Sequence, residues 1–209
     1  MSQQHVGSYS ASGERSAEYV RVTSETQITG RIRLDGSGKV NVSTGIPFFD
    51  HMLTQIAKHS HMDLELDAEG DLAVDAHHTV EDCGIVFGEL VRRALGDRRG
   101  IRRFASARVP LDEALVDVAV DISGRPFLHY EVDPPGERIL GKPPFDPQLM
   151  EEFWRAFVTT AAVTLHVTMV RGKNTHHVIE ASCKAVAVAL RDALRLEGPD
   201  DVPSTKGTL

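Results

Sequence analysis

The chain has 209 residues, which is enough for one large domain or two small ones. Hydrophobic residues make up 41 % and charged residues 25 %, so we expect a globular core and exclude a largely disordered chain. The net charge of −7 argues against nucleic-acid binding, and the absence of an apolar run of about 18–20 residues argues against a membrane span.

Cysteine and histidine usage narrows the class of protein further. Cys83 and Cys183 cannot form a disulfide framework, which fits a reducing, cytoplasmic compartment. Both lie in apolar periodic segments, so we expect them to be small buried core residues. The chain has ten histidines, and histidine is the commonest metal ligand among side chains. The sequence therefore favours a metal site over a disulfide framework.

An internal repeat organises the chain. The segment 77–81, HHTVE, recurs at 176–180 as HHVIE. Shorter matches lie in the same order, 34–39 with 120–125 and 49–53 with 150–154. This order indicates two duplicated units with loops of different length. We expect one compact duplicated domain, divided into a disordered tail at 1–14, a first half at 15–100, a second half at 101–197 and a C-terminal tail at 198–209.

The two halves predict similar elements in chain order. In the first half, a β-prone segment at 26–35 ends in a Gly-Ser-Gly turn, and a helix begins at Pro47. Strands at 63–67 and 72–75 follow. In the second half, 115–122 alternates between apolar and polar residues, a helix begins near Pro147, and a strand covers 163–170.

Each histidine motif then opens a long segment in which apolar residues recur at helical spacing. The predicted fold class is α+β. It is a strand-strand-helix-strand-strand-helix unit made twice, with two four-stranded sheets packed on helices.

The spacing of the repeated motif suits metal binding. Residues i and i+4 share a helix face, so His77 with Glu81, and His176 with Glu180, can each chelate one ion. The second histidine of each pair, His78 or His177, lies about 100° further round the helix and must point elsewhere, for example to a second metal. A solvated helix start with a first-turn carboxylate is the alternative for a single motif. Two copies make that alternative less favoured.

The ligand types restrict the metal. Imidazole and carboxylate without thiolate suit Mn, Fe, Co, Ni or Zn better than Ca or Mg. The chain has no CxxC pair, so a closed structural zinc site is not expected. His51 precedes a predicted helical segment and can add a further ligand, and its repeat partner is Glu152. Solvent exposure is the competing interpretation for Glu152.

The remaining histidines are expected to be structural. His59 and His61 lie at a joint between helix and strand, where we expect local hydrogen bonds. His129 and His166 alternate with apolar residues in predicted strands, and His5 lies in the N-terminal tail.

Together these motifs resemble the imidazoleglycerol-phosphate dehydratase family. The resemblance covers about residue 18 to the C-terminus and is carried by GIPFFDHML at 45–53, HHTVED at 77–82, GIRRF at 100–104, PLDEAL at 110–115, DISGRP at 121–126, HHVIEA at 176–181 and PSTKG at 203–207. A chain of 209 residues leaves no room for an additional phosphatase domain, so the resemblance is to the monofunctional form.

The resemblance implies a reaction and an assembly. The reaction is the dehydration of imidazole glycerol phosphate to imidazole acetol phosphate in histidine biosynthesis, with two Mn²⁺ ions per active site. The assembly is a homo-oligomer of 24 subunits with active sites where chains meet.

The resemblance also implies site residues. Positions that match the metal ligands are His51, His77, His78, Glu81, His176, His177 and Glu180. Glu152 stands where some relatives have a histidine, which leaves it as a ligand or as a neighbour of one. Positions that match substrate contacts are Gln55, Arg103, Arg125, Ser204, Thr205 and Lys206, of which the last five form the phosphate-binding set. Glu25 and Glu180 are the carboxylates expected to move protons, in an order that stays open.

Two other functions compete with this interpretation. One is a non-catalytic metal-binding oligomer, which would need the histidine motifs but neither Glu25 nor the phosphate-binding set. The other is a metal-dependent hydrolase of a phosphorylated small molecule, which would need a metal-bound water and no imidazole specificity.

Overall fold

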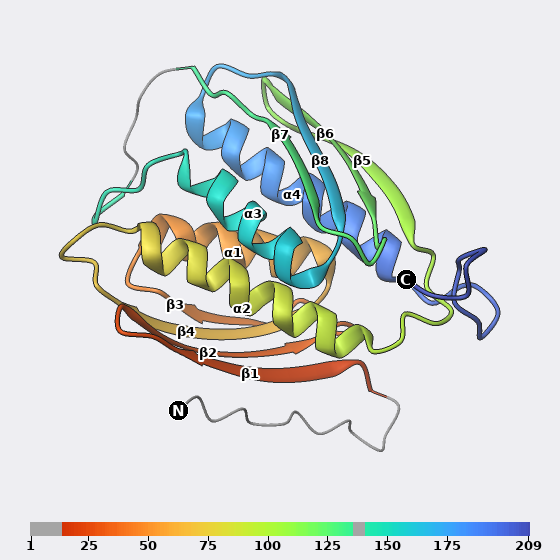
Figure 1. Ribbon diagram of the computed structural model, residues 1–209. Coiled ribbons are helices and arrows are strands. Elements are labelled where there is room, and N and C mark those ends of the chain that lie inside the picture. The colour runs from red at the N-terminus through yellow and green to blue at the C-terminus, as the bar shows by residue number, and fades with distance from the viewer. Residues whose placement is uncertain (1–13, 136–140) are drawn as a thin grey trace.

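The computed structural model describes residues 14–135 and 141–209. The chain forms four layers, a sheet, two layers of helices and a second sheet, with the helices between the sheets (Figure 1). The predicted disordered tail at 1–14 lies almost wholly outside the described residues, as does His5. No described helix is long and apolar enough to cross a membrane.

The first half forms the first sheet and two helices. Its elements are β1 Ser16–Val22, β2 Thr26–Arg33, β3 Val40–Ser43, α1 Pro47–Ser60, β4 Asp63–Gly70 and α2 His77–Leu95. The sheet order is β1-β2-β4-β3, in which only β3 and β4 pair in parallel. Inward side chains of β2 and β4 alternate with exposed polar ones, as expected for a sheet with one face in the core.

The second half repeats this topology. Its elements are β5 Phe104–Leu111, β6 Ala114–Asp121, β7 Phe127–Glu131, α3 Leu149–Ala161, β8 Thr164–Arg171 and α4 Thr175–Leu194. The order β5-β6-β8-β7, with only β7 and β8 parallel, matches the first sheet strand for strand. The prediction of an α+β duplication with two four-stranded sheets is confirmed.

The order of strands within each unit differs from the prediction. Three strands precede the first helix and one strand lies between the helices, so the predicted strand at 72–75 is wrong. These residues form a turn in which the Val74 N–H donates to the Asp71 carbonyl at 2.7 Å. Val74 is largely exposed, so its alternation with Leu72 does not mark a buried face.

The helix starts follow the sequence closely. α1 begins at Pro47 as predicted, and α2 begins at His77, the first residue of its motif. α3 begins at Leu149, two residues after Pro147, because the Asp146 and Pro147 carbonyls accept the first bonds of a preceding turn.

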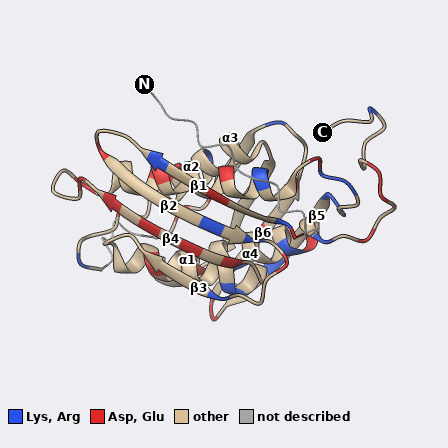
Figure 2. Cartoon of the chain, turned by 90° about the horizontal axis from the view of Figure 1, so that it is seen from below, with Lys and Arg blue, Asp and Glu red and all other residues tan. Residues whose placement is uncertain are grey.

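Each sheet is covered by helices on one face. α1 and α2 pack on the first sheet, α3 and α4 on the second, and the two helix layers meet as α2 on α3 and α1 on α4 (Figure 1). Glycine allows the close approach of α2 to α3: a Cβ at Gly84 would lie 2.5 Å from the Phe153 carbonyl oxygen. The outer face of the first sheet carries charges of both signs along β1, β2 and β4 (Figure 2).

The core runs through both halves without a break. Cys83 and Cys183 are free and fully buried, as expected from the sequence. Burial raises the pKa of both thiols, so neither is a reactive thiolate near neutral pH. The cysteines therefore serve as small core residues on α2 and α4.

Candidate active site

Both histidine motifs lie in the first turn of a long helix. α4 begins one residue before His176, and the side chain of Asn174 accepts a hydrogen bond from the His177 N–H at 3.2 Å. In α2, the Asp75 carboxylate accepts from the His77 N–H at 2.7 Å. These two hydrogen bonds satisfy free N–H groups at the helix starts.

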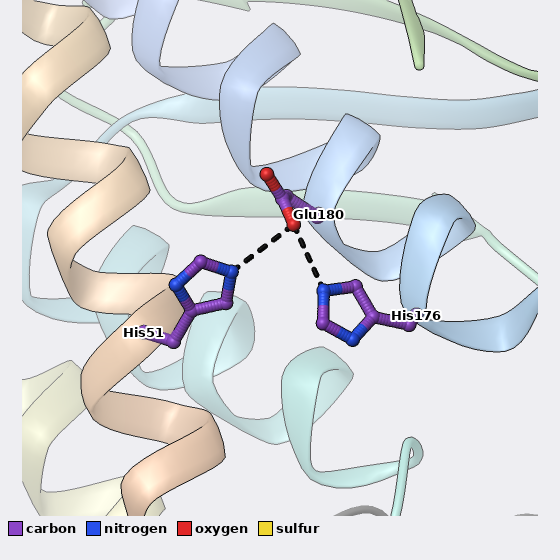
Figure 3. Close-up of side chains that lie close together, drawn as sticks. All are labelled: His51, His176 and Glu180. Atoms are coloured by element: carbon purple, nitrogen blue, oxygen red, sulfur yellow. Dashed lines mark hydrogen bonds and ion pairs between the residues drawn. The ribbon is translucent and has the colours of Figure 1, made fainter. Parts of the chain in front are cut away.

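One histidine from each of two helices meets a carboxylate. His51 of α1 and His176 of α4 each place Nε2 against Oε2 of Glu180, at 3.1 and 2.9 Å (Figure 3). Within residues 14–135 and 141–209, this is the one group of three or more possible ligands whose donor atoms lie within 4.8 Å of one another. The predicted ligands His176 and Glu180 of the second motif thus lie beside the predicted ligand His51, although 129 residues separate His51 from Glu180.

Lys184 is a fourth member of this group that sequence reasoning missed. Its Nζ lies 2.6 Å from Oε1 of Glu180, one helix turn away on α4. Burial alone would raise the pKa of Glu180, but the hydrogen bonds from Lys184 and the two histidines outweigh it and lower the pKa to about 2. Glu180 is therefore an anion at neutral pH and available as a ligand. The i+4 spacing from Glu180 was a signal that could have identified Lys184.

The second histidine of each motif is held by a carboxylate from a loop. His78 Nδ1 donates to Asp71 at 3.0 Å and lies 3.8 Å from Glu25. The hydrogen bond with Asp71 raises the pKa of His78. Glu25, predicted as a proton carrier, therefore lies beside the first motif with its side chain half exposed.

The equivalent pair in the second half is His177 and Glu113. His177 Nδ1 donates to Glu113 at 2.8 Å, and this hydrogen bond raises the pKa of His177 and lowers that of Glu113 to about 2. Glu113 also accepts from the N–H groups of Lys173 and Asn174. Sequence reasoning assigned no role to Asp71 or Glu113, because each lies in a loop outside the repeated motif.

The predicted ligands His77, Glu81 and Glu152 do not join the described group. They are partly exposed on α2 and α3, and Glu152 lies 3.6 Å from Arg155, one turn further along its helix. The placement of Glu152 on α3 nevertheless matches that of His51 on α1, and α3 packs on α2 as α1 packs on α4. In the duplicated fold, His77, Glu81 and Glu152 thus occupy positions on α2 and α3 that are equivalent to those of the His51 group on α1 and α4.

The predicted substrate contacts divide between the two ends of the molecule. Gln55 lies next to the His51 group, with Nε2 at 3.4 Å from His51 Nδ1. Arg103 lies at the other end of α4, where its N–H donates to the Ala193 carbonyl. With about 1.5 Å of rise per residue, the helix from His176 to Ala193 is about 25 Å long.

Arg103 connects to the C-terminal tail. Its guanidinium donates to Asp121 at 2.8 Å and to the Pro203 carbonyl at 2.7 Å. Arg125 is exposed, with Nη1 at 3.3 Å from the Ser123 carbonyl. Ser204 is partly buried, and Thr205 and Lys206 are exposed. The predicted phosphate-binding residues thus gather around residues 121–125 and the tail.

The other described histidines lie in the parts of the fold predicted for them. His59 lies in the last turn of α1 and His61 follows that helix. His129 and His166 are opposite one another on β7 and β8.

Comparisons with known proteins agree with the sequence motifs. A family model described as imidazoleglycerol-phosphate dehydratase matches residues 44–190. A relative of that name from Gluconacetobacter diazotrophicus is 55 % identical over 197 residues, which cover 93 % of this chain and 98 % of the relative. Another from Thioalkalivibrio sulfidiphilus is 56 % identical over 200 residues, covering 94 % and 99 %.

Solved structures agree as well. The chain resembles imidazoleglycerol-phosphate dehydratase from Staphylococcus aureus, with a TM-score of 0.78 and 38 % identity, covering 87 % of this chain and 99 % of the other. It also resembles the enzyme from Pyrococcus furiosus in complex with (S)-C348, with a TM-score of 0.75 and 34 % identity, covering 91 % and 100 %.

Proposed function

The chain belongs to the imidazoleglycerol-phosphate dehydratase family, and we propose here how its residues carry out the family's reaction. It is a hydro-lyase of histidine biosynthesis that removes water from imidazole glycerol phosphate to give imidazole acetol phosphate. The observation that carries the assignment of the site is the meeting of His51, His176 and Glu180 from two helices.

The residues fit a transition metal. Two imidazoles and a carboxylate, with no thiolate beside them, form a donor set suited to Mn²⁺ and its neighbours. When bound, such an ion supplies Lewis acidity and a template for the imidazole ring of the substrate. We propose two Mn²⁺ ions per active site, with His51, His176 and Glu180 as ligands from one helix pair.

The repeat supports a second ligand set from the other helix pair. His77 and Glu81 begin α2 as His176 and Glu180 begin α4, and Glu152 stands where α1 has His51. We assign these three residues to the second set, with Glu152 as a ligand. His78 and His177, each with Nδ1 already bonded, have Nε2 available as additional donors.

A site built between chains follows from the length of the helices. The His51 group and the Arg103 region lie at opposite ends of α4, about 25 Å apart along the helix. The substrate joins its imidazole to its phosphate through only three carbons, which is several times too short. The metal end and the phosphate end of each site therefore come from different chains, and we propose that the sites lie where chains meet in an assembly of 24 subunits.

We propose that carboxylates transfer the protons of the reaction. Elimination takes a proton from one carbon, while the hydroxyl leaves the carbon beside the ring with a proton, as water. The enol that remains becomes the ketone. Glu25 suits the proton-transfer role, because it is half exposed and lies beside His78. Glu180 already accepts three hydrogen bonds, so it moves a proton only after these contacts rearrange.

The phosphate end binds and orients the substrate. Arg103, Arg125 and Lys206 supply positive charge, and Ser204 and Thr205 supply hydroxyl donors. Charge-assisted hydrogen bonds from guanidinium groups would fix the phosphate. Because the phosphate lies away from the reacting carbons, its binding free energy can be used to orient them. The free cysteines fit a reducing compartment, and we propose a cytoplasmic location.

The test is a product assay with imidazole glycerol phosphate. Metal-free protein supplied with Mn²⁺ should form the ketone, and chelation should stop its formation. A metal store would form no product, and a hydrolase would release inorganic phosphate. Either of these outcomes would contradict the proposal.

A further inference from the structure

The two halves hold their second histidine by different means. In the second half, Glu113 directly precedes β6 and bonds His177 Nδ1 at 2.8 Å. In the first half, the equivalent residue is Glu25, which directly precedes β2. Glu25 remains 3.8 Å from His78 Nδ1, because Asp71 takes the bond at 3.0 Å.

Asp71 has no acidic counterpart in the second half. It follows Gly70, where a Cβ would meet Thr79 and Thr26. A Cβ at Gly172 would meet Val178 and Ala114, the equivalent residues of the second half, so Gly172 corresponds to Gly70 and Lys173 corresponds to Asp71. The second half therefore has a lysine where the first half has the carboxylate of Asp71.

We propose that Asp71 and Glu113 are positioning residues for His78 and His177, and that Asp71 leaves Glu25 free of this task. Each carboxylate accepts the Nδ1 proton, which fixes the ring orientation and directs Nε2 away from the loop, toward a metal. Glu25 and Glu113 occupy equivalent places in the repeat but have different roles. This inference rests on the proposed metal sites.

Exposure of the carboxylates agrees with this division. The side chain of Asp71 is 27 % exposed and that of Glu113 is 35 % exposed, whereas Glu25 is 50 % exposed. The two carboxylates that hold a histidine are thus the more enclosed ones. The carboxylate that holds none is the most exposed of the three.

The test measures Mn²⁺ affinity, by electron paramagnetic resonance of the free ion, in the full assembled protein. Glu113→Gln keeps an oxygen acceptor for the loop N–H groups but replaces the anionic partner of His177. It should weaken Mn²⁺ binding about 10–100-fold. Glu25→Gln, the matched change in the other half, should leave the affinity within about twofold of that of the unmodified chain.

A double-mutant cycle tests the role of Asp71. Asp71→Ala should weaken Mn²⁺ binding about 10–100-fold in the unmodified chain and less than about twofold when His78 is already alanine. Glu69→Gln, which removes an exposed carboxylate from the same strand end, is the control for charge and should have no effect.

Three outcomes would overturn the inference. They are unchanged affinity in Asp71→Ala and Glu113→Gln, an Asp71→Ala effect that is the same without His78, or an equal loss in Glu25→Gln and Glu113→Gln. If the unmodified chain bound no Mn²⁺, the proposed metal sites would fail, and this inference would fail with them.

Discussion

Glu25 and Glu180 have different surroundings, and the difference separates their roles. Glu180 is mostly buried and accepts from two histidines and a lysine, so its charge is fully engaged. Glu25 is half exposed, and the carboxylate of Asp71 holds the histidine beside it. A proton acceptor must be free to reach the substrate, which favours Glu25.

The Glu25→Gln variant tests that role. Glutamine keeps the shape of the side chain but cannot accept a proton, so kcat should fall by about 10²–10⁴-fold. Folding and assembly size should not change, since Glu25 is at the surface of a turn. Steady-state kinetics with Mn²⁺ check the prediction, with Glu18→Gln on β1 as the control. A kcat near that of the unmodified chain would assign proton transfer to another group.

At the scale of single residues, the sequence reveals motif residues better than their supports. The spacing of His176 and Glu180 predicted a shared helix face, and the sequence offered His51 as a further ligand. The roles of Asp71 and Glu113 could not be predicted from the sequence, because a carboxylate in a loop belongs to no periodic pattern. Their partners are defined only when the β-turns fold against the helix starts.

Among the elements, helices were easier to predict than strands. α2 and α4 each carry a long stripe of apolar residues at helical spacing, and these residues are buried in the core. The short β3 and β7 lie at sheet edges with alternating or continuous partial exposure, so they lack the clear pattern of a buried strand. At 72–75 a strand was predicted where the chain forms a turn. Two apolar residues at alternate positions are too few to specify a strand.

The junction of β2, β3 and β4 depends on one carboxylate. Asp63 accepts from the N–H groups of Ser37 and Lys39 at 2.7 and 2.9 Å and from Arg33. Burial alone would raise the pKa of Asp63, but these hydrogen bonds outweigh it and lower the pKa below its usual value of 3.8. Asp63 therefore stabilises the fold in its charged form.

The Asp63→Asn variant should lose unfolding free energy on the order of 2 kcal/mol at neutral pH, because charge-assisted hydrogen bonds are lost. A carboxyl whose pKa is lowered by folding stabilises the protein above its unfolded-state pKa, and that contribution disappears as pH falls through about 3.8 and below. The difference between the two proteins should thus shrink in acid. Denaturant unfolding at several pH values checks this, with exposed Asp67→Asn as the control. A constant difference down to low pH would contradict it.

The C-terminal tail is the second element with a testable role. Deletion of residues 203–209 should raise KM strongly for the phosphorylated substrate, because it removes three predicted phosphate contacts and the carbonyl that Arg103 binds. Metal content and assembly size should stay unchanged. Added salt should weaken binding by the intact chain more than by the truncated one, because part of the attraction is Coulombic. If kcat/KM were unchanged by the deletion, Arg103 and Arg125 would suffice for the phosphate.

On the scale of the whole molecule, the duplicated fold places the two ends of the proposed site apart. The histidine motifs begin α2 and α4, and the Arg103 region lies beyond the C-terminal ends of the same helices (Figure 1). Packing of the helices between the two sheets holds these ends apart within one chain. The repeat in the sequence predicted the sheets and helices, but only the structure gives the distance between the histidine motifs and the Arg103 region.

Metal removal should affect assembly as well as activity, because we expect the sites, and the metals in them, to lie where chains meet. If metal ions are bound by ligands from more than one chain, their binding free energy adds to association. Chelation should reduce the particle size measured by light scattering, and Mn²⁺ should restore both size and activity. A chelated protein of unchanged size would show that no metal lies between chains.

Mixed assemblies test most directly whether each active site takes its ends from two chains. Glu25→Gln impairs the metal end, Arg103→Ala impairs the phosphate end, and each variant alone should have little activity. In co-expressed, randomly mixed assemblies at equal amounts, about a quarter of the sites should combine two unmodified ends. We predict that activity recovers to about a quarter of that of the unmodified protein. Activity no higher than the average of the two variants would contradict the account, because it would place both ends of the site in one chain.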